Sequence, residues 1–339
     1  MKKLLSVLLA LLMVFSLAAC GGKTEETETG AKTVKVGVSI YKFDDTFMTN
    51  YRNEIEAYFA TLNTDDVTYE VTTMDGKNDM DEQTNQIDNF ITQGYDVLIL
   101  NLVQSSAAQT IVDKCADAGI PCVFINREPD ADVMASKDGT DYAGKFCYVG
   151  ADARQSGKMQ GEIIADLENK GDLNGDGKLQ YIMIEGDPEN VDAQYRTQYS
   201  IEQYLAVSGL EVECLVDQVG NWNRDEGETI AANALTQYGD KIEVIFANND
   251  DMADGALTAI KAAGRTVGTD IYLVGVDAND YAVADVLEGT FTGTVLNDAV
   301  GQSHAAVDAA VAAANGEALD TYYWVDYVKV TAANAADYQ

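Results

Sequence analysis

Residues 242–256 read IEVIFANNDDMADGA, and the fold class can be inferred from the pattern in this segment. Residues 244–247 are consecutively apolar, which is typical of a strand buried on both faces of a sheet. Three polar residues follow, and residues 251–263 then have the spacing of a helix. A buried strand, a polar turn and a helix in this order form the repeating unit of a parallel sheet.

The same unit recurs along most of the chain. Strands are predicted over residues 34–40, 67–73, 97–101, 122–126, 146–149, 181–185, 212–216, 244–247, 271–276 and 292–296. Helices are predicted over residues 51–62, 80–93, 105–118, 153–169, 194–208, 226–238, 251–263, 281–288 and 298–314. Two successive runs in a chain of 339 residues predict an α/β fold with two doubly wound parallel-sheet domains.

The composition excludes several classes of protein. The 56 acidic and 22 basic residues give a net charge of −34, which argues against binding to nucleic acid or to anionic lipid headgroups. A hydrophobic fraction of 47% argues against a disordered chain. His304 is the single histidine, so histidine-based catalysis and sites with several histidine ligands are not expected.

The N-terminus has the pattern of an export signal. Two lysines precede an apolar run over residues 4–17, and Ala18 and Ala19 lead to Cys20. This ending resembles a bacterial lipobox, so residues 1–19 are predicted to be a signal peptide and Cys20 to be lipidated. An ordinary cleaved signal is the alternative. The polar residues that follow are predicted to form a flexible tether over residues 20–33.

Four cysteines follow the predicted signal, and an even number in an exported protein permits disulfides. Three of them, Cys122, Cys147 and Cys214, lie in apolar strand patterns, whereas Cys115 lies in a predicted helix. The favoured interpretation is that these residues are small buried hydrophobic side chains with free thiols.

Polar and aromatic residues follow the predicted strands, at the edge where ligands bind in such sheets. They lie at positions 42–47, 126–127, 186–192, 222, 248–250, 277 and 297–298. Carboxylates accept hydrogen bonds from hydroxyl groups, amides accept and donate, and arginine donates a rigid fork. Aromatic rings pack on the C–H faces of a sugar. Together these residues predict a site for a polyhydroxylated ligand.

Residues 172–180, DLNGDGKLQ, have the spacing of the first nine positions of an EF-hand loop. Oxygen ligands would come from Asp172, Asn174, Asp176, the carbonyl of Lys178 and Gln180. Position 12 is an apolar Met183, so the bidentate acid must come from elsewhere, and Glu185 and Glu243 are both candidates. The alternative is an acidic turn without a metal. The spacing favours a structural Ca²⁺ site.

With these motifs, the chain resembles the bacterial galactose/glucose-binding proteins, which are sugar receptors of ABC importers and, in some species, of chemotaxis. The resemblance covers residues 34–315. It is specific at the segments VGVSIYKFDDTFM, FINREP, DLNGDGKLQ, VDAQYRTQY, IEVIFANNDDMADGA, GVDA and GTVLNDA.

The resemblance implies a type I periplasmic-binding-protein fold, in which the chain crosses a hinge three times, near Gly150, Asn297 and Asp326. It implies an N-terminal domain of residues 34–149 plus 297–326 and a C-terminal domain of residues 150–296 plus 327–339. The protein is then expected to be a monomeric, non-enzymatic receptor, lipid-anchored at the outer face of the cell membrane or periplasmic.

The resemblance also implies the site residues. The ligand would be D-galactose or D-glucose, and the partners an ABC permease and, in some species, a chemoreceptor. Glu243 is selected over Glu185 as the last Ca²⁺ ligand. The family has a histidine where this chain has Asn190, which bears on epimer preference and affinity. The implied sugar-binding residues are Asp45, Phe47, Asn126, Asn190, Asp192, Arg196, Trp222, Asn249, Asp277 and Asn297.

Three alternatives compete with this interpretation. A transcription regulator of the same fold would need a basic helix-turn-helix where this chain has a signal and an acidic tether. A secreted glycosidase could use paired carboxylates such as Asp45 and Asp277. A receptor for ribose, xylose or a signalling ligand would share the architecture, and Asn190 keeps this alternative open.

Overall fold

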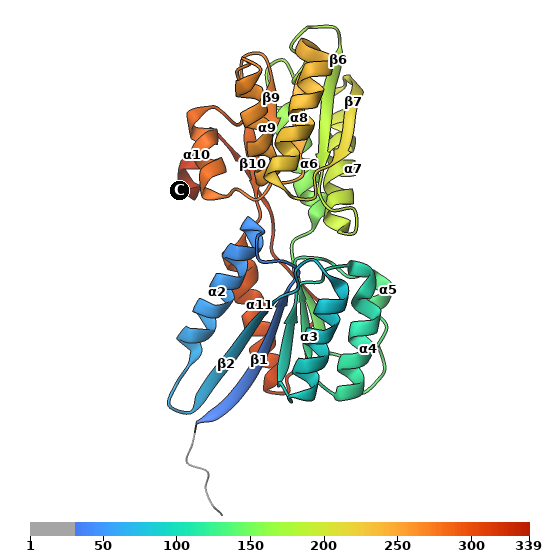
Figure 1. The fold of residues 1–339 in the computed structure, drawn as a ribbon, viewed down its shortest axis with the longest axis vertical. Helices are drawn as coiled ribbons and strands as arrows, with labels where there is room; N and C mark the ends of the chain where they lie inside the picture. The colour runs from blue at the N-terminus through green and yellow to red at the C-terminus, as the bar shows by residue number, and fades with distance from the viewer. Residues whose placement is uncertain (1–30) are drawn as a thin grey trace, which may run out of the picture.

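The computed structural model describes residues 31–339, which form two α/β domains stacked along the long axis of the molecule (Figure 1). The first domain contains a six-stranded sheet with the strand order β2-β1-β3-β4-β5-β11. Its strands are β1 (Lys32–Ile40), β2 (Val67–Asp75), β3 (Val97–Leu100), β4 (Cys122–Ile125), β5 (Phe146–Gly150) and β11 (Tyr322–Trp324). Its helices are α2 (Thr46–Leu62), α3 (Met80–Thr92), α4 (Ala108–Ala118), the short α5 (Ala131–Met134) and α11 (Ala299–Ala314).

The second domain repeats this architecture with the strand order β7-β6-β8-β9-β10-β12. Its strands are β6 (Lys178–Glu185), β7 (Glu211–Val219), β8 (Val244–Ala247), β9 (Tyr272–Val274), β10 (Gly293–Leu296) and β12 (Val328–Thr331). Its helices are α6 (Ala153–Ala165), α7 (Val191–Ser208), α8 (Arg224–Tyr238), α9 (Asp250–Ala262) and α10 (Asp280–Glu288). The predicted fold class, two doubly wound domains with largely parallel sheets, is confirmed.

Within the described residues the chain passes between the two domains at three places. It leaves β5 for α6, returns from β10 to α11, and crosses again from β11 in the first sheet to β12 in the second. Helix α11 packs on the first domain, where Ala306 and Val307 join its core and Ser303 donates a hydrogen bond to the carbonyl of Tyr51. Figure 1 shows these connecting segments side by side at the junction of the domains.

The strand order determines where polar groups can gather. In each sheet the order reverses beside the first strand, between β1 and β3 in one domain and between β6 and β8 in the other. Loops after the strands on either side of such a reversal diverge and leave a crevice at the carboxyl edge of the sheet. Each domain therefore has a crevice that can receive a ligand.

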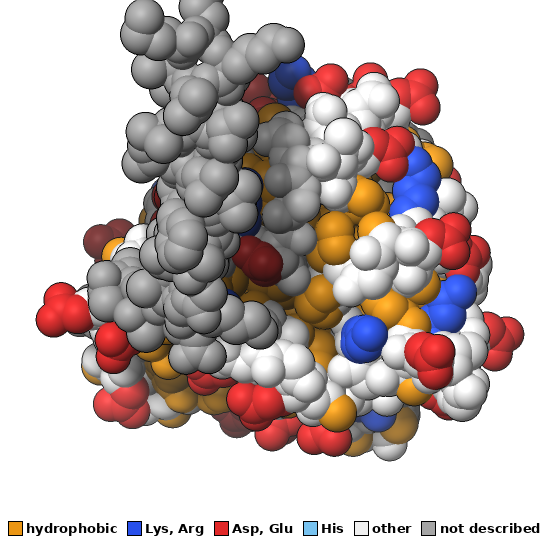
Figure 2. Space-filling model, turned by 90° about the horizontal axis from the view of Figure 1, so that it is seen from below, with side chains coloured by type: hydrophobic (Ala, Val, Ile, Leu, Met, Phe, Trp, Pro, Cys, Tyr) orange, Lys and Arg blue, Asp and Glu red, His pale blue; other side chains and the backbone are white. Residues whose placement is uncertain are grey.

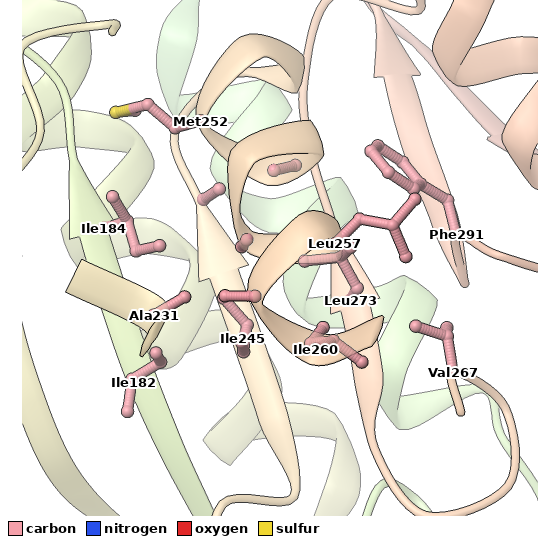
Figure 3. Close-up of a cluster of buried hydrophobic side chains, with 14 of the residues drawn as sticks. Ile182, Ile184, Ala231, Ile245, Met252, Leu257, Ile260, Val267, Leu273 and Phe291 are labelled. Atoms are coloured by element: carbon pink, nitrogen blue, oxygen red, sulfur yellow. The ribbon is translucent and has the colours of Figure 1, made fainter. Parts of the chain in front are cut away.

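Apolar layers on both faces of each sheet hold the domains together. In the second domain, α9 places Leu257 and Ile260 against Ile245 and Leu273 of the sheet, and Phe291 closes one side of this cluster (Figure 3). These side chains are buried, as expected for strands that are apolar on both faces.

Two glycines let α6 and α7 approach closely. A Cβ atom on Gly161 would lie 2.2 Å from the carbonyl oxygen of Ser200, and one on Gly157 would lie 3.0 Å from the carbonyl oxygen of Arg196. Because neither distance leaves room for a methyl group against rigid backbone, these positions require glycine. The contact fixes α7, which bears two of the predicted ligand-binding residues, Asp192 and Arg196.

The C-terminal elements were not predicted from the sequence. Strand β11 is short and half-exposed, and β12 pairs antiparallel with β10. Neither has the apolar run of a central strand, because each lies at the edge of its sheet. Pairing of β12 with β10 and packing of the last residues against α10 then hold the C-terminus on the second domain.

The prediction of buried cysteines is wrong for one residue. Cys115, Cys122 and Cys147 are buried with free thiols, as predicted. Cys214 also has a free thiol but is exposed. It lies on β7, and this strand ends its sheet, so the apolar pattern around Cys214 does not mark a central strand.

The predicted signal peptide, the predicted lipidation site at Cys20 and most of the predicted tether lie outside the described residues. In the part of the chain from residue 31 onward, no helix is long and apolar enough to span a membrane. Figure 2 shows acidic side chains distributed around the end of the first domain, with lysine and arginine between them. This distribution matches a chain with 56 acidic residues and gives no single basic patch on the visible face.

The close contact of α6 and α7 leads to a prediction for stability. Gly161→Ala should lower the free energy of unfolding by about 2–3 kcal/mol, because the added methyl group forces the helices apart. Chemical denaturation of the ligand-free protein measures this. Gly316→Ala is the control, since Gly316 has φ +80° and open space, so only backbone strain of about 1–2 kcal/mol is added. Equal losses in both variants would contradict the packing argument.

Candidate ligand-binding site

A small polar cavity lies between the two domains. All ten sugar-binding residues implied by the resemblance line it, together with three others. The lining residues are Tyr41, Asp45, Phe47, Met48, Asn126, Arg127, Asn190, Asp192, Arg196, Trp222, Asn249, Asp277 and Asn297.

The first domain presents Asp45 and Phe47 at the beginning of α2. Asp45 is the N-cap of this helix: one carboxylate oxygen accepts a hydrogen bond from the amide of Met48 at 2.7 Å. The other oxygen accepts from the hydroxyl of Tyr41 at 2.6 Å. A carboxylate has about four acceptor positions, so Asp45 retains capacity for a ligand. Phe47 is buried and packs edge-on against Tyr51.

Asn126 follows β4 with a φ of +62°, in the left-handed region. Its side-chain oxygen accepts a hydrogen bond from the Asn101 amide at 3.0 Å, and its carbonyl accepts from the hydroxyl of Tyr148 at 2.9 Å. These two contacts fix the turn and leave the Asn126 NH₂ group as a donor at the cavity.

In the second domain, α7 begins at the cavity. Asn190 is its N-cap, and its side-chain oxygen accepts from the amide of Asp192 at 3.0 Å. The oxygen of Asn190 is thus engaged, so this residue offers its NH₂ group to a ligand. Asp192 lies in the first turn, and Arg196 lies one turn later on the same face.

Trp222 is 8% exposed and lies at the end of the loop after β7. A Cβ atom on Gly186 would lie 2.2 Å from the indole ring, so the ring rests directly on the glycine backbone. Asn249 caps α9 by accepting from the amide of Met252 at 3.0 Å, and its NH₂ group lies 3.5 Å from the carbonyl of Trp222. Asn249 therefore connects the N-terminus of α9 to the backbone of Trp222.

Asp277 and Asn297 connect the cavity to the second crossing segment. The Asn297 amide donates to the carboxylate of Asp277 at 3.3 Å, and the side-chain oxygen of Asn297 accepts from Gln302 at 2.6 Å. Gln302 belongs to α11 of the first domain. This chain of hydrogen bonds therefore joins a cavity carboxylate of one domain to a helix of the other.

Three of the cavity residues have a positive backbone φ, a conformation that residues other than glycine rarely adopt. Asn126 and Trp222 have φ values of +62°, and Asp277 has a φ of +124°. Such conformations cost of the order of 1–3 kcal/mol each and persist where the surroundings fix them, often at functional sites. Neither propensity nor periodicity predicts them.

Buried charges of both signs face the cavity. Burial raises the pKa of the Asp192 carboxyl to about 6, although the guanidinium groups of Arg196 and Arg127 act in the opposite direction. Burial also raises the pKa of Asp277 well above its usual range, against the effect of Arg196, whose Nη1 lies 3.8 Å from the carboxylate. Burial therefore removes hydration from these carboxylates that the nearby guanidinium groups offset only in part.

Arg127 is among the strand-end residues that predict a ligand site, but the set implied by the resemblance omits it. It is 1% exposed, its Nη1 donates to the carbonyl of Val103, and its guanidinium lies 3.9 Å from the centre of the Tyr41 ring. Its Nε and Nη2 atoms are buried without a partner. A sequence signal was present, because Arg127 directly follows Asn126 at the end of a strand.

Arg127 also connects the domains. Its Nη1 lies 3.3 Å from the carboxylate of Asp187, which belongs to the loop between β6 and α7 of the second domain. The guanidinium therefore lines the cavity and also joins the two domains beside it. Tyr41 and Met48 are the two lining residues that the sequence analysis did not name, and both are buried.

The loop predicted to bind Ca²⁺ lies away from this cavity, ahead of β6. Asp172 accepts hydrogen bonds from the amides of Gly175 and Gly177 at 2.6 and 2.9 Å. Gly177 has a φ of +87°, so the tight turn requires glycine there. Asn174 and Asp176 each accept a hydrogen bond from the amide two residues later, and these bonds fix the turn.

Glu243 closes the loop from the beginning of β8. It is 1% exposed, and its two oxygens accept from the amides of Leu173, Asn174 and Gln180 at 2.7, 3.0 and 2.9 Å. The side-chain oxygen of Gln180 accepts a hydrogen bond from Nδ2 of Asn174 at 2.9 Å, and its Nε2 donates to the carboxylate of Asp176 at 2.9 Å. Burial raises the pKa of Glu243, and the three backbone donors oppose this shift.

Glu185 does not reach this loop. It ends β6, whereas the loop runs into the first residues of the same strand, and about 16 Å of extended chain separates Gln180 from Glu185. Among residues 31–339, acids, thiols and the imidazole are nowhere gathered in a group of three or more that could hold a metal ion. The loop instead combines carboxylate, amide and carbonyl oxygens, and this donor set fits Ca²⁺.

A polar cavity enclosed between two doubly wound domains is the architecture of a solute-binding protein. The chain belongs to the periplasmic binding proteins, because residues 36–318 match the family model described as a periplasmic binding protein domain. The general expectation of a type I periplasmic binding protein is thereby confirmed, while the narrower galactose/glucose assignment stays a prediction.

Similar proteins cover nearly the whole chain. A putative rhizopine-binding protein of Rhizobium meliloti is 36% identical over 92% of this chain and 94% of its own length. The D-galactose/methyl-galactoside binding periplasmic protein MglB of Haemophilus influenzae is 34% identical over 90% of this chain and 91% of its own length.

A solved structure has a similar fold and sequence. It is an ABC transporter solute binding protein from Bacillus halodurans with bound myo-inositol, with a TM-score of 0.77 and 31% identity over 92% of this chain and 98% of that chain. All three of these relatives are described as binding proteins rather than enzymes.

The raised pKa of Asp192 leads to a prediction for pH dependence. Between pH 3.8 and about 6 the folded protein binds more protons at this residue than the unfolded chain, so its contribution to the free energy of unfolding falls as pH rises. In the wild type, this residue should lower the free energy of unfolding by about 2–3 kcal/mol between pH 4 and 7, and Asp192→Asn should lack this decrease. Denaturation of the ligand-free protein measures it. Parallel pH profiles of wild type and variant would contradict this.

Proposed function

We propose that this protein is an extracytoplasmic solute-binding lipoprotein that captures D-galactose or D-glucose between its domains and delivers it to an ABC importer. The observation that carries the proposal is the composition of the cavity wall. Both domains contribute to it, with three carboxylates, four side-chain amides, two guanidinium groups and the aromatic rings of Phe47 and Trp222 among its residues. This is the set of groups that a hydroxylated ring requires.

Each kind of group has a defined role in the proposed mechanism. Asp45, Asp192 and Asp277 accept hydrogen bonds from sugar hydroxyls. Arg127 and Arg196 have buried Nε atoms without a partner, which donate to oxygen atoms of the ring or its hydroxyls. Hydrogen bonds that involve a charged partner contribute about 1.5–3 kcal/mol each. A sugar that lacks one hydroxyl leaves a buried group unpaired, and this is the basis of discrimination.

Binding is coupled to domain closure in this mechanism. The ligand touches residues of both domains, so it binds more tightly to the closed state and shifts the hinge equilibrium toward it. The ion pair of Arg127 and Asp187 bridges the domains and stabilises the same state. A membrane permease, and in some species a chemoreceptor, then recognises the closed form. The acyl chains on Cys20 retain the protein at the membrane.

A cyclitol such as myo-inositol is the second candidate ligand. It is favoured by the Bacillus halodurans structure, which is 31% identical and contains myo-inositol, and by the similarity to a putative rhizopine-binding protein. A cyclitol presents hydroxyls around a six-membered ring, as a hexopyranose does, but has no ring oxygen. Asn190, which offers a short neutral donor, is compatible with either ring.

Calorimetric titration of the mature protein with glucose, galactose, myo-inositol, ribose and xylose tests the proposal. We expect tight binding of a hexose. Trp222→Ala should weaken it about 10- to 100-fold, because the ring loses apolar contact worth about 1.5–3 kcal/mol. Leu287→Ala is the control for the loss of an apolar side chain, since Leu287 is 39% exposed, lies on α10 and is outside the cavity.

Asp45→Asn is preferable to Asp45→Ala in the same experiment. Asparagine keeps the N-cap of α2 and removes the charge, so weaker binding reports the lost acceptor and not a frayed helix. Tight binding of myo-inositol without hexose binding would establish the second candidate. Hexose affinity that neither Trp222→Ala nor Asp45→Asn changes would overturn the site assignment.

We also propose that Asp172, Asn174, Asp176, the Lys178 carbonyl, Gln180 and Glu243 hold a structural Ca²⁺. The ion would join the loop at the start of β6 to the beginning of β8. Chelation should lower the melting temperature, and Glu243→Gln should abolish this sensitivity, whereas Glu185→Gln should retain it. Calorimetric sugar binding by the chelated, still folded protein should persist. A melting temperature unaffected by calcium and chelator would refute the proposal.

A further inference from the structure

Tyr327 lies on the third crossing segment, between β11 of the first sheet and β12 of the second. It is 3% exposed, and its hydroxyl accepts a hydrogen bond from Nη2 of Arg196 at 3.1 Å. Tyr327 does not line the cavity. It was absent from the predicted site, because it lies beyond residues 34–315, which the resemblance covers.

The Arg196 side chain is fixed by a small number of contacts. Nη1 donates to the carbonyl of Asn248 at 2.7 Å and lies 3.8 Å from the carboxylate of Asp277. Nη2 contacts Tyr327, and Nε is buried without a partner. The guanidinium also lies 5.5 Å from the Trp222 ring. The tyrosine hydroxyl therefore holds one end of a planar group whose remaining donor is free for a ligand.

The backbone of Tyr327 makes a second hydrogen bond. Its amide donates to the side-chain oxygen of Gln155 at 2.8 Å, and the Gln155 NH₂ group lies 3.4 Å from the carboxylate of Asp326. Gln155 is in the first turn of α6, directly after the first crossing segment. Tyr327 thus contacts a binding-site arginine through its side chain and the first crossing segment through its backbone.

We propose that Tyr327 is a positioning residue that couples occupation of the cavity to the conformation of the hinge. The inference rests on the proposed function, since it takes Arg196 as a ligand donor. A movement of the segment from Trp324 to Val328 displaces the Tyr327 hydroxyl, and the guanidinium then loses one of its fixed partners. A ligand that orders Arg196 favours, in return, the hinge conformation in which the hydroxyl meets Nη2.

The protonation state of Tyr327 is consistent with this role. Burial raises the pKa of the Tyr327 hydroxyl to about 12, although Arg196 lowers it. The hydroxyl is therefore neutral at physiological pH. It accepts from the guanidinium without neutralising its charge, so Arg196 keeps its full strength as a donor to a ligand.

Tyr327→Phe tests the inference, because it removes the hydroxyl and keeps the ring. With the same four sugars and myo-inositol as ligands, we expect the affinity for the tightest one to fall about 5- to 20-fold, mostly through faster dissociation. The melting temperature of the ligand-free protein should change little. Tyr322→Phe is the matched control in the neighbouring strand β11, and it should bind with wild-type affinity.

A double-mutant cycle separates positioning from a general structural effect. In the Arg196→Lys background, Tyr327→Phe should change affinity less than twofold, because the planar partner of the hydroxyl is already absent. An equal loss in both backgrounds, or a wild-type affinity for Tyr327→Phe, would overturn the inference while leaving the proposed function intact. Failure of the wild type to bind any of these polyols would overturn both.

Discussion

The carboxyl ends of two parallel sheets face each other, and this constraint underlies the whole molecule. In a parallel sheet every strand leaves the layer at the same edge, and each following helix begins there. Polar turn residues and helix N-termini therefore gather at that edge without any separate device. Because the chain crosses between the domains three times, the two edges are held opposite one another and their polar residues enclose one cavity.

The cavity combines features that would each destabilise an ordinary core. Asp192 and Arg196 are each 3% exposed, and burial raises the pKa of the carboxyl. Asp277 has a strained backbone, and Arg127 has two buried nitrogens without partners. These costs fit a site that leaves its groups for a ligand to satisfy. The domains themselves are stabilised elsewhere, by the apolar layers on both faces of the sheets and by the close contact of α6 with α7.

Sequence patterns predicted the alternation of strands and helices, because each central strand is a continuous apolar run and each helix has one apolar face. They could not predict β11 and β12, which are short edge strands without such runs. Cys214 is exposed because β7 lies at the edge of its sheet, and strand order cannot be read from the sequence. Strand-end residues indicated the site, yet the partners of Arg127 and the contact of Tyr327 depend on segments distant in sequence.

Three cavity residues, Asp45, Asn190 and Asn249, are also helix N-caps. Only a few residue types cap a helix well, chiefly serine, threonine, aspartate and asparagine. Evolution toward a new ligand is therefore restricted at these positions, because most substitutions would also fray a helix. Positions without a cap, such as Phe47 and Arg127, are free of this restriction, and related receptors can diverge there at a smaller cost in stability.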